Sequence, residues 1–191
     1  MGIDPGSCIT GYGIIDVTKN KSCWVNSGCI RTPDAALPIR LKSIFRGLSE
    51  LIAEYQPTEM AIEKVFMHRN PDSALKLGQA RGTAICVVAN QDIPVHEYTP
   101  REIKQAIVGK GNASKVQMQH MVRVLLGLNK FPQEDAADAL AIALCCAHLR
   151  ASLQNFEQAV GKQTLVSNKN KIDLKAMNVF KRSARKRRSR I

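Results

Sequence analysis

The sequence lacks the features of an exported or membrane-bound protein. It contains no run of apolar residues that looks long enough to span a bilayer, and its N-terminus has no charged-then-apolar signal pattern. Its six cysteines include no CxxC pair and no spacing with a nearby histidine that suits zinc. We therefore expect a cytoplasmic protein whose cysteines are small buried hydrophobic residues in a reducing compartment.

Acidic residues are scarce toward the C-terminus. The 191 residues include 28 Lys/Arg and 16 Asp/Glu, a net charge of +12, but residues 1–150 hold 17 of the basic and 14 of the acidic side chains. Most of the basic excess therefore falls in residues 151–191, where periodicity is weak. We expect one domain over 1–150 and a mostly disordered basic tail over 151–191. A basic balance suggests a polyanionic partner.

Strand and helix signals alternate along the first 150 residues. Three strands are expected before residue 32, the last two as a hairpin, and further strands over 60–66 and 94–98. Helices are expected over 36–55, 70–90, 99–109 and 114–128, and from about residue 132 onward. This order, with its antiparallel start, predicts an α/β layer fold with one central sheet.

Two details of this pattern lead to further expectations. Gly78 and Gly82 lie on one face of the second helix, and each costs about 1 kcal/mol relative to alanine. We therefore expect a close backbone approach there, as in a helix pair within the chain or across a dimer. Only three residues precede Asp4, whereas strands usually have about 5–6. The first strand thus looks clipped, and we expect either a natural start upstream of Met1 or reduced stability.

Four carboxylates occupy unusual places in the pattern. Asp4 ends a strand before a Pro-Gly turn, and Glu63 lies in, or at the exposed end of, an otherwise apolar strand. Asp135 and Asp138 share one face in the first turn of a nearly all-apolar helix. Each has an ordinary interpretation, since an Asp commonly begins a turn and acids in a first turn suit the helix dipole. The functional interpretation depends on whether the fold brings all four together.

Such a set of carboxylates would require cations, because like charges a few ångströms apart repel strongly. Hard divalent cations prefer oxygen ligands, and Mg²⁺ is the most available. Two such ions could activate a water on one side of a phosphodiester and stabilise the leaving oxygen on the other. That is nuclease chemistry.

Several segments, in order from residue 2 to about residue 150, resemble the RuvC family of crossover-junction endodeoxyribonucleases. A single segment is weak evidence, since Asp-Pro-Gly occurs widely, but the ordered set is specific. The segments are Gly2-Ile3-Asp4-Pro5-Gly6-Ser7 with Thr10-Gly11-Tyr12-Gly13, Ala61-Ile62-Glu63-Lys64-Val65-Phe66, Asp72-Ser73-Ala74-Leu75-Lys76-Leu77-Gly78-Gln79-Ala80-Arg81-Gly82, and Asp135-Ala136-Ala137-Asp138-Ala139-Leu140-Ala141.

The resemblance implies a ribonuclease H-like fold, with a central mixed five-stranded sheet flanked by helices, and a homodimer with two active sites. It implies paired symmetric nicks in four-way (Holliday) junction DNA during homologous recombination and DNA repair. The implied cofactor is Mg²⁺, two ions per active site, with Mn²⁺ as a substitute. A branch-migration motor complex is implied as a partner.

The resemblance also implies roles for individual residues. Phe66 matches an aromatic residue that stacks on a base, and Lys104 and Lys115 match basic residues beside the active site that contact phosphate. Lys115 could also stabilise the transition state. Without the resemblance, Phe66 could be a core residue and both lysines solvated surface charges. The catalytic and metal-ligating positions implied are Asp4, Glu63, Asp135 and Asp138.

The sequence departs from the family at both ends. The family has several apolar residues before the first segment and ends soon after the last helix. The basic tail is therefore extra, and we expect it to add nonspecific, salt-sensitive phosphate contacts.

Three other functions remain open from the sequence. A related ribonuclease H-like nuclease that trims ribosomal RNA precursors shares an early Asp-x-Gly segment. Actin-like ATPases and sugar kinases open with a similar turn, but they need a second domain for which this chain is too short. A catalytically inert junction-binding module is the third, although four acids would repel DNA phosphates.

Overall fold

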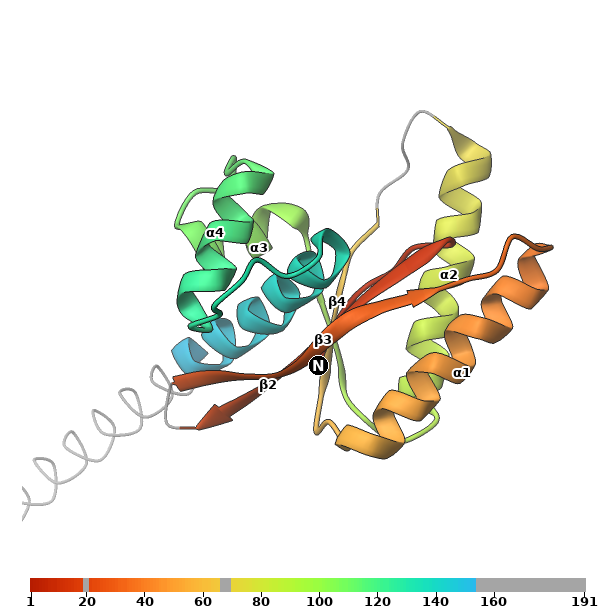
Figure 1. Ribbon diagram of the computed structural model, residues 1–191, viewed down its shortest axis with the longest axis horizontal. Helices are drawn as coiled ribbons and strands as arrows, with labels where there is room; N and C mark the ends of the chain where they lie inside the picture. The colour runs from red at the N-terminus through yellow and green to blue at the C-terminus, as the bar shows by residue number, and fades with distance from the viewer. Residues whose placement is uncertain (19–20, 66–69, 154–191) are drawn as a thin grey trace, which may run out of the picture. The chain divides into compact units, whose positions relative to one another are not determined.

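A mixed sheet of five strands forms the centre of the computed structural model, which describes residues 1–18, 21–65 and 70–153 (Figure 1). The strand order is β3-β2-β1-β4-β5; β1 and β3 pair with β2 antiparallel, and β4 pairs with β1 and β5 in parallel. This confirms the predicted fold class. The strands are β1 (Gly2–Asp4), β2 (Ile9–Thr18), β3 (Lys21–Arg31), β4 (Met60–Glu63) and β5 (Val95–Tyr98).

Helices cover both faces of this sheet. α1 and α2 lie on one side, whereas α3, α4 and a further helix, Glu134–Leu153, lie on the other (Figure 1). We name Glu134–Leu153 the apolar helix. Capping boxes of Thr99 with Glu102 and of Ser114 with Gln117 form at the starts of α3 and α4, two of the helices predicted from the sequence. The bounds of the others are α1 (Leu37–Tyr55), α2 (Pro71–Ala89), α3 (Pro100–Val108) and α4 (Lys115–Leu125).

Two hydrophobic cores follow from the alternation of side chains along the strands. In β4, Met60 and Ile62 belong to the core under α1 and α2, whereas Ala61 between them belongs to the core of the opposite face. The first core includes Ile3, Ile14, Ile44, Leu48, Ile52, Ala84, Val87 and Val88. The second includes Ile103, Ile107, Met118, Val122, Leu140, Ile142, Leu144 and Cys145.

The backbone of the apolar helix lies directly on glycines of β1 and β2. A Cβ atom at Gly2 would lie 2.2 Å from the carbonyl oxygen of Ala139, and one at Gly11 would lie 2.1 Å from that of Asp135. Real Cβ atoms do not approach this closely, so only glycine lets the helix reach the sheet at these positions. This contact sets the position of the helix relative to β1.

The apolar helix corrects the expectation that no segment could span a bilayer. By length and composition it is long and apolar enough to cross a membrane, with a mean hydropathy of 1.4 over its 18-residue window. Of that window, 56% is buried inside the protein. Its hydrophobic residues are thus accounted for by the second core, and it is a core helix of this fold.

Some local expectations were wrong. The strand expected over 60–66 ends at Glu63, which places Glu63 at a strand end. Within the described part of the chain, a Cβ atom at Gly78 or Gly82 would meet nothing within 4 Å. The close backbone approach is therefore not made by the described residues of this chain, and the alternative, an approach across a dimer, stays a prediction.

The cysteine expectation holds only in part. Cys145 and Cys146 are buried, but Cys8, Cys23 and Cys86 are exposed.

The chain forms a compact unit over Met1–Leu149, and a second unit begins at Arg150. The tail over 154–191 lies outside the described residues, so its predicted disorder stays a prediction.

We predict that Gly13→Ala lowers the free energy of unfolding by roughly 1–3 kcal/mol, the usual range for overpacking. The added Cβ would lie 2.7 Å from the Leu140 nitrogen and 2.8 Å from its Cα, so the apolar helix would have to move. Lys42→Ala, on the exposed surface of α1, is the matched control and should change the free energy of unfolding by less than about 0.5 kcal/mol. Urea denaturation measures both. Equal stability of Gly13→Ala and wild type would contradict the prediction.

Candidate active site

Two of the four predicted acids end neighbouring parallel strands. Asp4 is the last residue of β1 and Glu63 is the last residue of β4. The register pairs Ile3 with Ile62, so the two carboxylates follow adjacent positions at the same edge of the sheet. Arg81 from α2 donates from Nε to the Glu63 carbonyl oxygen at 3.1 Å, which fixes the end of β4.

The apolar helix brings the other two acids to this edge. Asp4 pairs with Gly11 on β2, and the backbone of Asp135 lies against Gly11. Asp138 is one helical turn further along and is 32% exposed. The glycine contact described above therefore places the first turn of this helix beside the end of β1.

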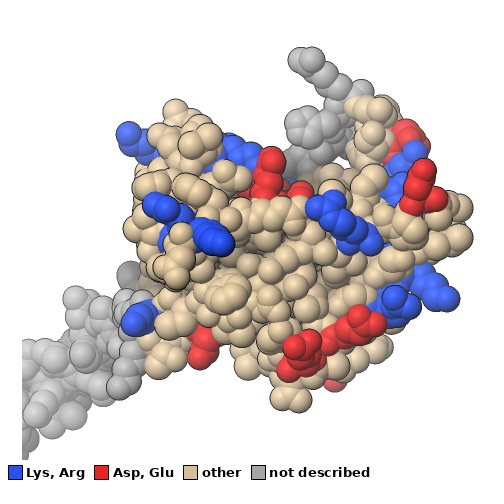
Figure 2. All heavy atoms as spheres, viewed as in Figure 1, with Lys and Arg blue, Asp and Glu red and all other residues tan. Residues whose placement is uncertain are grey.

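A pocket of about 310 Å³ joins these groups to two lysines. Five of the predicted site residues line it: Asp4, Glu63, Lys104, Lys115 and Asp138. Asp135 is near enough to Asp4 for its charge to raise the pKa of Asp4, and its Oδ2 accepts from Gln133 Nε2 at 3.4 Å and from Cys29 Sγ at 3.9 Å. In Figure 2, acidic side chains gather in a hollow at the top of the molecule, with Lys and Arg side chains on either side.

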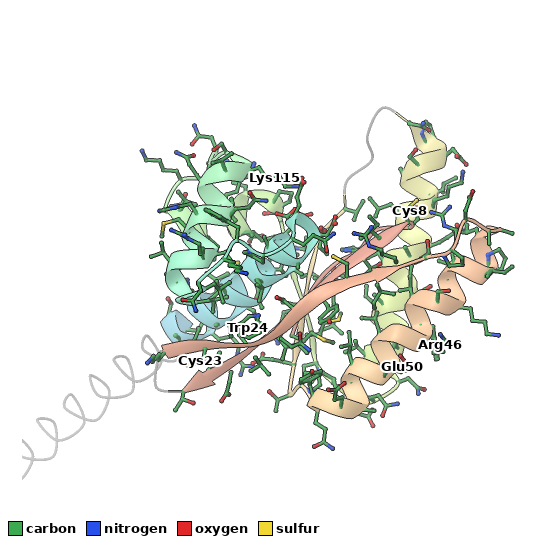
Figure 3. All side chains as sticks on the ribbon, in the orientation of Figure 1. Cys8, Cys23, Trp24, Arg46, Glu50 and Lys115 are labelled. Atoms are coloured by element: carbon green, nitrogen blue, oxygen red, sulfur yellow. The ribbon has the colours of Figure 1, made fainter. Side chains whose placement is uncertain are left out.

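Lys115 pairs directly with one of the four acids. It projects from the start of α4 toward the apolar helix (Figure 3), with Nζ 3.0 Å from Asp138 Oδ2, and it also pairs with Glu134. Burial by itself would lower the pKa of Lys115, but the contacts with Glu134 and Asp138 outweigh burial and raise it. Lys115 therefore stays protonated beside the carboxylates.

Burial and mutual repulsion shift the acids toward their neutral forms. Burial raises the pKa of Asp4 most, followed by the charges of Asp138, Glu63 and Asp135, and together they bring it to about 7. Burial and Asp138 also raise the pKa of Glu63. Lys115 lowers the pKa of Asp4 and Lys104 that of Glu63, but neither lysine outweighs burial and the neighbouring acids. A cluster of carboxylate oxygens in this condition fits a hard divalent cation such as Mg²⁺.

The structure thus brings together all four predicted acids and both predicted lysines, whose catalytic and binding roles stay predictions. Phe66 lies outside the described residues. Glu134, Cys29 and Arg81 also contact the site, and no role was predicted for them. Glu134 could have been found from its place next to Asp135, and Arg81 lies in a segment that carries the family resemblance, but no local signal marks Cys29.

The sheet has five strands in this mixed order, and carboxylates lie at the ends of two of its central strands and on the helix packed over them. This combination defines the class of ribonuclease H-like nucleases. The profile of one family, described as crossover junction endodeoxyribonuclease RuvC, matches residues 1–146. The chain belongs to this family.

Individual relatives agree with the family match. The crossover junction endodeoxyribonuclease RuvC of Marinobacter nauticus is 56% identical over 162 residues, which is 85% of this chain and 93% of the relative. That of Aeromonas salmonicida is 57% identical over 153 residues, 80% of this chain and 88% of the relative.

Solved structures support the same fold. Thermus thermophilus RuvC in complex with a Holliday junction substrate has a TM-score of 0.74 and 34% identity, covering 78% of this chain and 92% of that one. The yeast mitochondrial Holliday junction resolvase has a TM-score of 0.62 over 84% of both chains. At 15% identity, the yeast protein is evidence for the fold only.

We predict that Asp4→Asn stabilises the metal-free protein at pH 8. The folded-state pKa of Asp4 is about 7 against an ordinary 3.8, so the folded state holds this proton more tightly and its stability falls as pH rises from about 4 to 7. Asn carries no charge, and its advantage should be roughly 2 kcal/mol larger at pH 8 than at pH 5.

Thermal unfolding in EDTA at both pH values tests this prediction. The expected rise in Tm at pH 8 is several degrees, and it should shrink at pH 5, where folded Asp4 is protonated. A Tm difference that is the same at both pH values would show that Asp4 has an ordinary pKa in the folded protein.

Proposed function

We propose that this protein is a structure-selective endodeoxyribonuclease that resolves four-way (Holliday) DNA junctions by paired symmetric phosphodiester hydrolysis in homologous recombination and DNA repair. The observation that carries the proposal is the convergence of Asp4, Glu63, Asp135 and Asp138 beside Lys115 at one edge of the sheet. The choice of DNA substrate rests on family membership and on the related Thermus thermophilus protein, whose structure contains a Holliday junction.

The four carboxylates would hold Mg²⁺, with two ions per site and Mn²⁺ as a substitute. The fit rests on the donor set, which offers oxygen ligands, and on the raised pKa of Asp4, which reflects burial first and then the charges of the neighbouring acids. When bound, Mg²⁺ would supply activation of the attacking water and stabilisation of charge on the phosphate. Near neutral pH a proton on Asp4 would compete with the cation, so we expect cleavage to increase with pH through about 7.

The two lysines would orient the DNA backbone. Lys104 and Lys115 line the same pocket as the acids, and Lys115 stays protonated through its contacts with Asp138 and Glu134. A phosphate bound in this pocket would meet a positive charge on the α3 and α4 side of the carboxylates. Lys115 could move from Asp138 to a phosphate oxygen as negative charge develops there, which would stabilise the transition state.

The remaining partners follow from family membership. We expect a homodimer, because two sites related by a two-fold axis would cut two strands in concert. Leu75, Gly78 and Gly82 lie along one face of α2, where Leu75 is 68% exposed and the glycines are open to solvent or a partner. Base stacking by Phe66, phosphate contacts from the basic tail, a branch-migration motor partner and a cytoplasmic location belong to the same proposal.

We predict that Asp138→Asn lowers the rate of junction cleavage by roughly 100-fold or more, because a carboxylate ligand contributes several kcal/mol to a metal-dependent transition state. The assay uses a synthetic four-way DNA junction in Mg²⁺ and in EDTA, with linear duplex and structured RNA as comparison substrates. Asp34→Asn is the matched control, because Asp34 is exposed outside the site. Wild type and the control should make paired symmetric nicks in the junction alone.

Two results would contradict the proposed function. Preferential cleavage of structured RNA would indicate another ribonuclease H-like nuclease. Junction binding without cleavage in Mg²⁺ would indicate an inert binding module. Two further observations would exclude the metal role of the acids. One is junction cleavage in EDTA at the rate seen in Mg²⁺, and the other is cleavage by Asp138→Asn at the rate of wild type.

We predict that Gly78→Glu converts the dimer to a monomer, because it places a charge in the middle of the open face of α2. Ala53→Glu, on the exposed surface of α1, is the matched control and should leave the dimer intact. Sedimentation velocity measures the association state, and junction cleavage should change from paired to single nicks. A dimer that survives Gly78→Glu would exclude this face as the interface.

A further inference from the structure

A second group of metal-binding side chains lies at the opposite end of the strands from the acids. Glu59 comes immediately before β4, His96 is on β5, and Cys146 is on the apolar helix. One ligand atom from each residue lies within 4.8 Å of the others. Glu63 ends β4, whereas Glu59 precedes it, so the length of β4 separates this group from the acidic site.

The distances in this group suit a small tetrahedral cation. His96 Nε2 lies 3.0 Å from Glu59 Oε2, and Cys146 Sγ lies 3.9 Å from the same oxygen. In a tetrahedral zinc site with bonds of about 2.0–2.3 Å, ligand atoms are roughly 3.2–3.8 Å apart. The two printed distances to Glu59 Oε2 are within a few tenths of an ångström of this range, and the third pair lies within 4.8 Å.

The His96 ring nitrogen supports a ligand at this place. Nε2 of His96 is buried and makes no hydrogen bond to the described residues, although it lies within ion-pair distance of Glu59. In the neutral tautomer that carries its proton on Nδ1, a lone pair on Nε2 would face the negative Glu59 carboxylate. A cation between the two atoms would convert this repulsion into two favourable contacts.

The donor types select the metal. A thiolate, an imidazole and a carboxylate are the ligands of zinc sites, whereas Mg²⁺ prefers oxygen alone. We propose that Glu59, His96 and Cys146 bind one Zn²⁺, with water in the fourth position, and that this site is separate from the one formed by the four acids.

A cation can reach this group from solvent. A pocket of about 350 Å³ is lined in part by Glu59, Cys146 and Met1. The Met1 ammonium donates to the Glu59 carbonyl oxygen at 2.9 Å, and burial lowers its pKa.

The site would join three separate elements. Glu59 belongs to the start of β4, His96 to the edge strand β5, and Cys146 to the helix that carries Asp135 and Asp138 near its other end. Zn²⁺ would therefore fasten the apolar helix to the sheet without touching the acids. Its expected effect is on stability, through preferential binding to the folded state.

Cobalt substitution tests the site directly, because Co²⁺ takes the place of Zn²⁺ and a thiolate ligand adds a charge-transfer absorption band that oxygen ligands lack. Wild-type protein should show this band, saturating at one Co²⁺ per chain and displaced by Zn²⁺. Cys146→Ser and His96→Gln should each lose or strongly weaken it. Cys29→Ser is the matched control, because Cys29 is the thiol beside Asp135, and it should keep the band.

Thermal unfolding gives a second, independent measurement. Zn²⁺ should raise the Tm of wild type and of Cys29→Ser by several degrees and should leave His96→Gln almost unchanged. His96 is partly exposed on an edge strand, so His96→Gln decides the question even if Cys146→Ser does not fold. The absence of a thiolate band in wild type, its persistence in His96→Gln, or its loss only in Cys29→Ser would overturn the proposal.

Discussion

The close contact between the apolar helix and the glycines of β1 and β2 determines the rest of this structure. At Gly2 and Gly11 a single added Cβ atom would overlap the helix backbone. Because no side chain intervenes, the helix rests at backbone distance from the sheet, and its first turn reaches the end of β1. The position of Asp135 and Asp138 relative to Asp4 is therefore a consequence of packing between glycine and helix backbone.

This packing holds together groups that repel one another. The raised pKa values of Asp4 and Glu63 record the unfavourable free energy of gathering buried carboxylates, which the two hydrophobic cores offset. Lys115 compensates part of the charge through Asp138 and Glu134. Clustered carboxylates are unfavourable by themselves, but they can bind divalent cations. A metal-dependent nuclease of this family requires such a cluster.

The same elements carry different chemistry at their two ends. At the end of β4 the carboxylate of Glu63 belongs to an oxygen-rich site, and before its start Glu59 lies beside a histidine and a cysteine. Hard cations favour the first donor set and borderline cations the second. The two sites on this sheet would therefore bind different metal ions because their ligand atoms differ, and no difference in cavity shape is needed.

Local signals in the sequence determined the elements, the two capping boxes and the identity of the four acids, because helix periodicity and caps depend on neighbours three or four residues apart. Sequence order also indicated the family. Only the tertiary structure decided that Glu63 ends its strand, that the apolar helix is a core helix, and that three cysteines are exposed. The tertiary structure also brings together Glu59, His96 and Cys146, whose spacing in the sequence matches no metal-binding motif. These features depend on contacts between strands and helices far apart in the chain, and residue spacing does not specify such contacts.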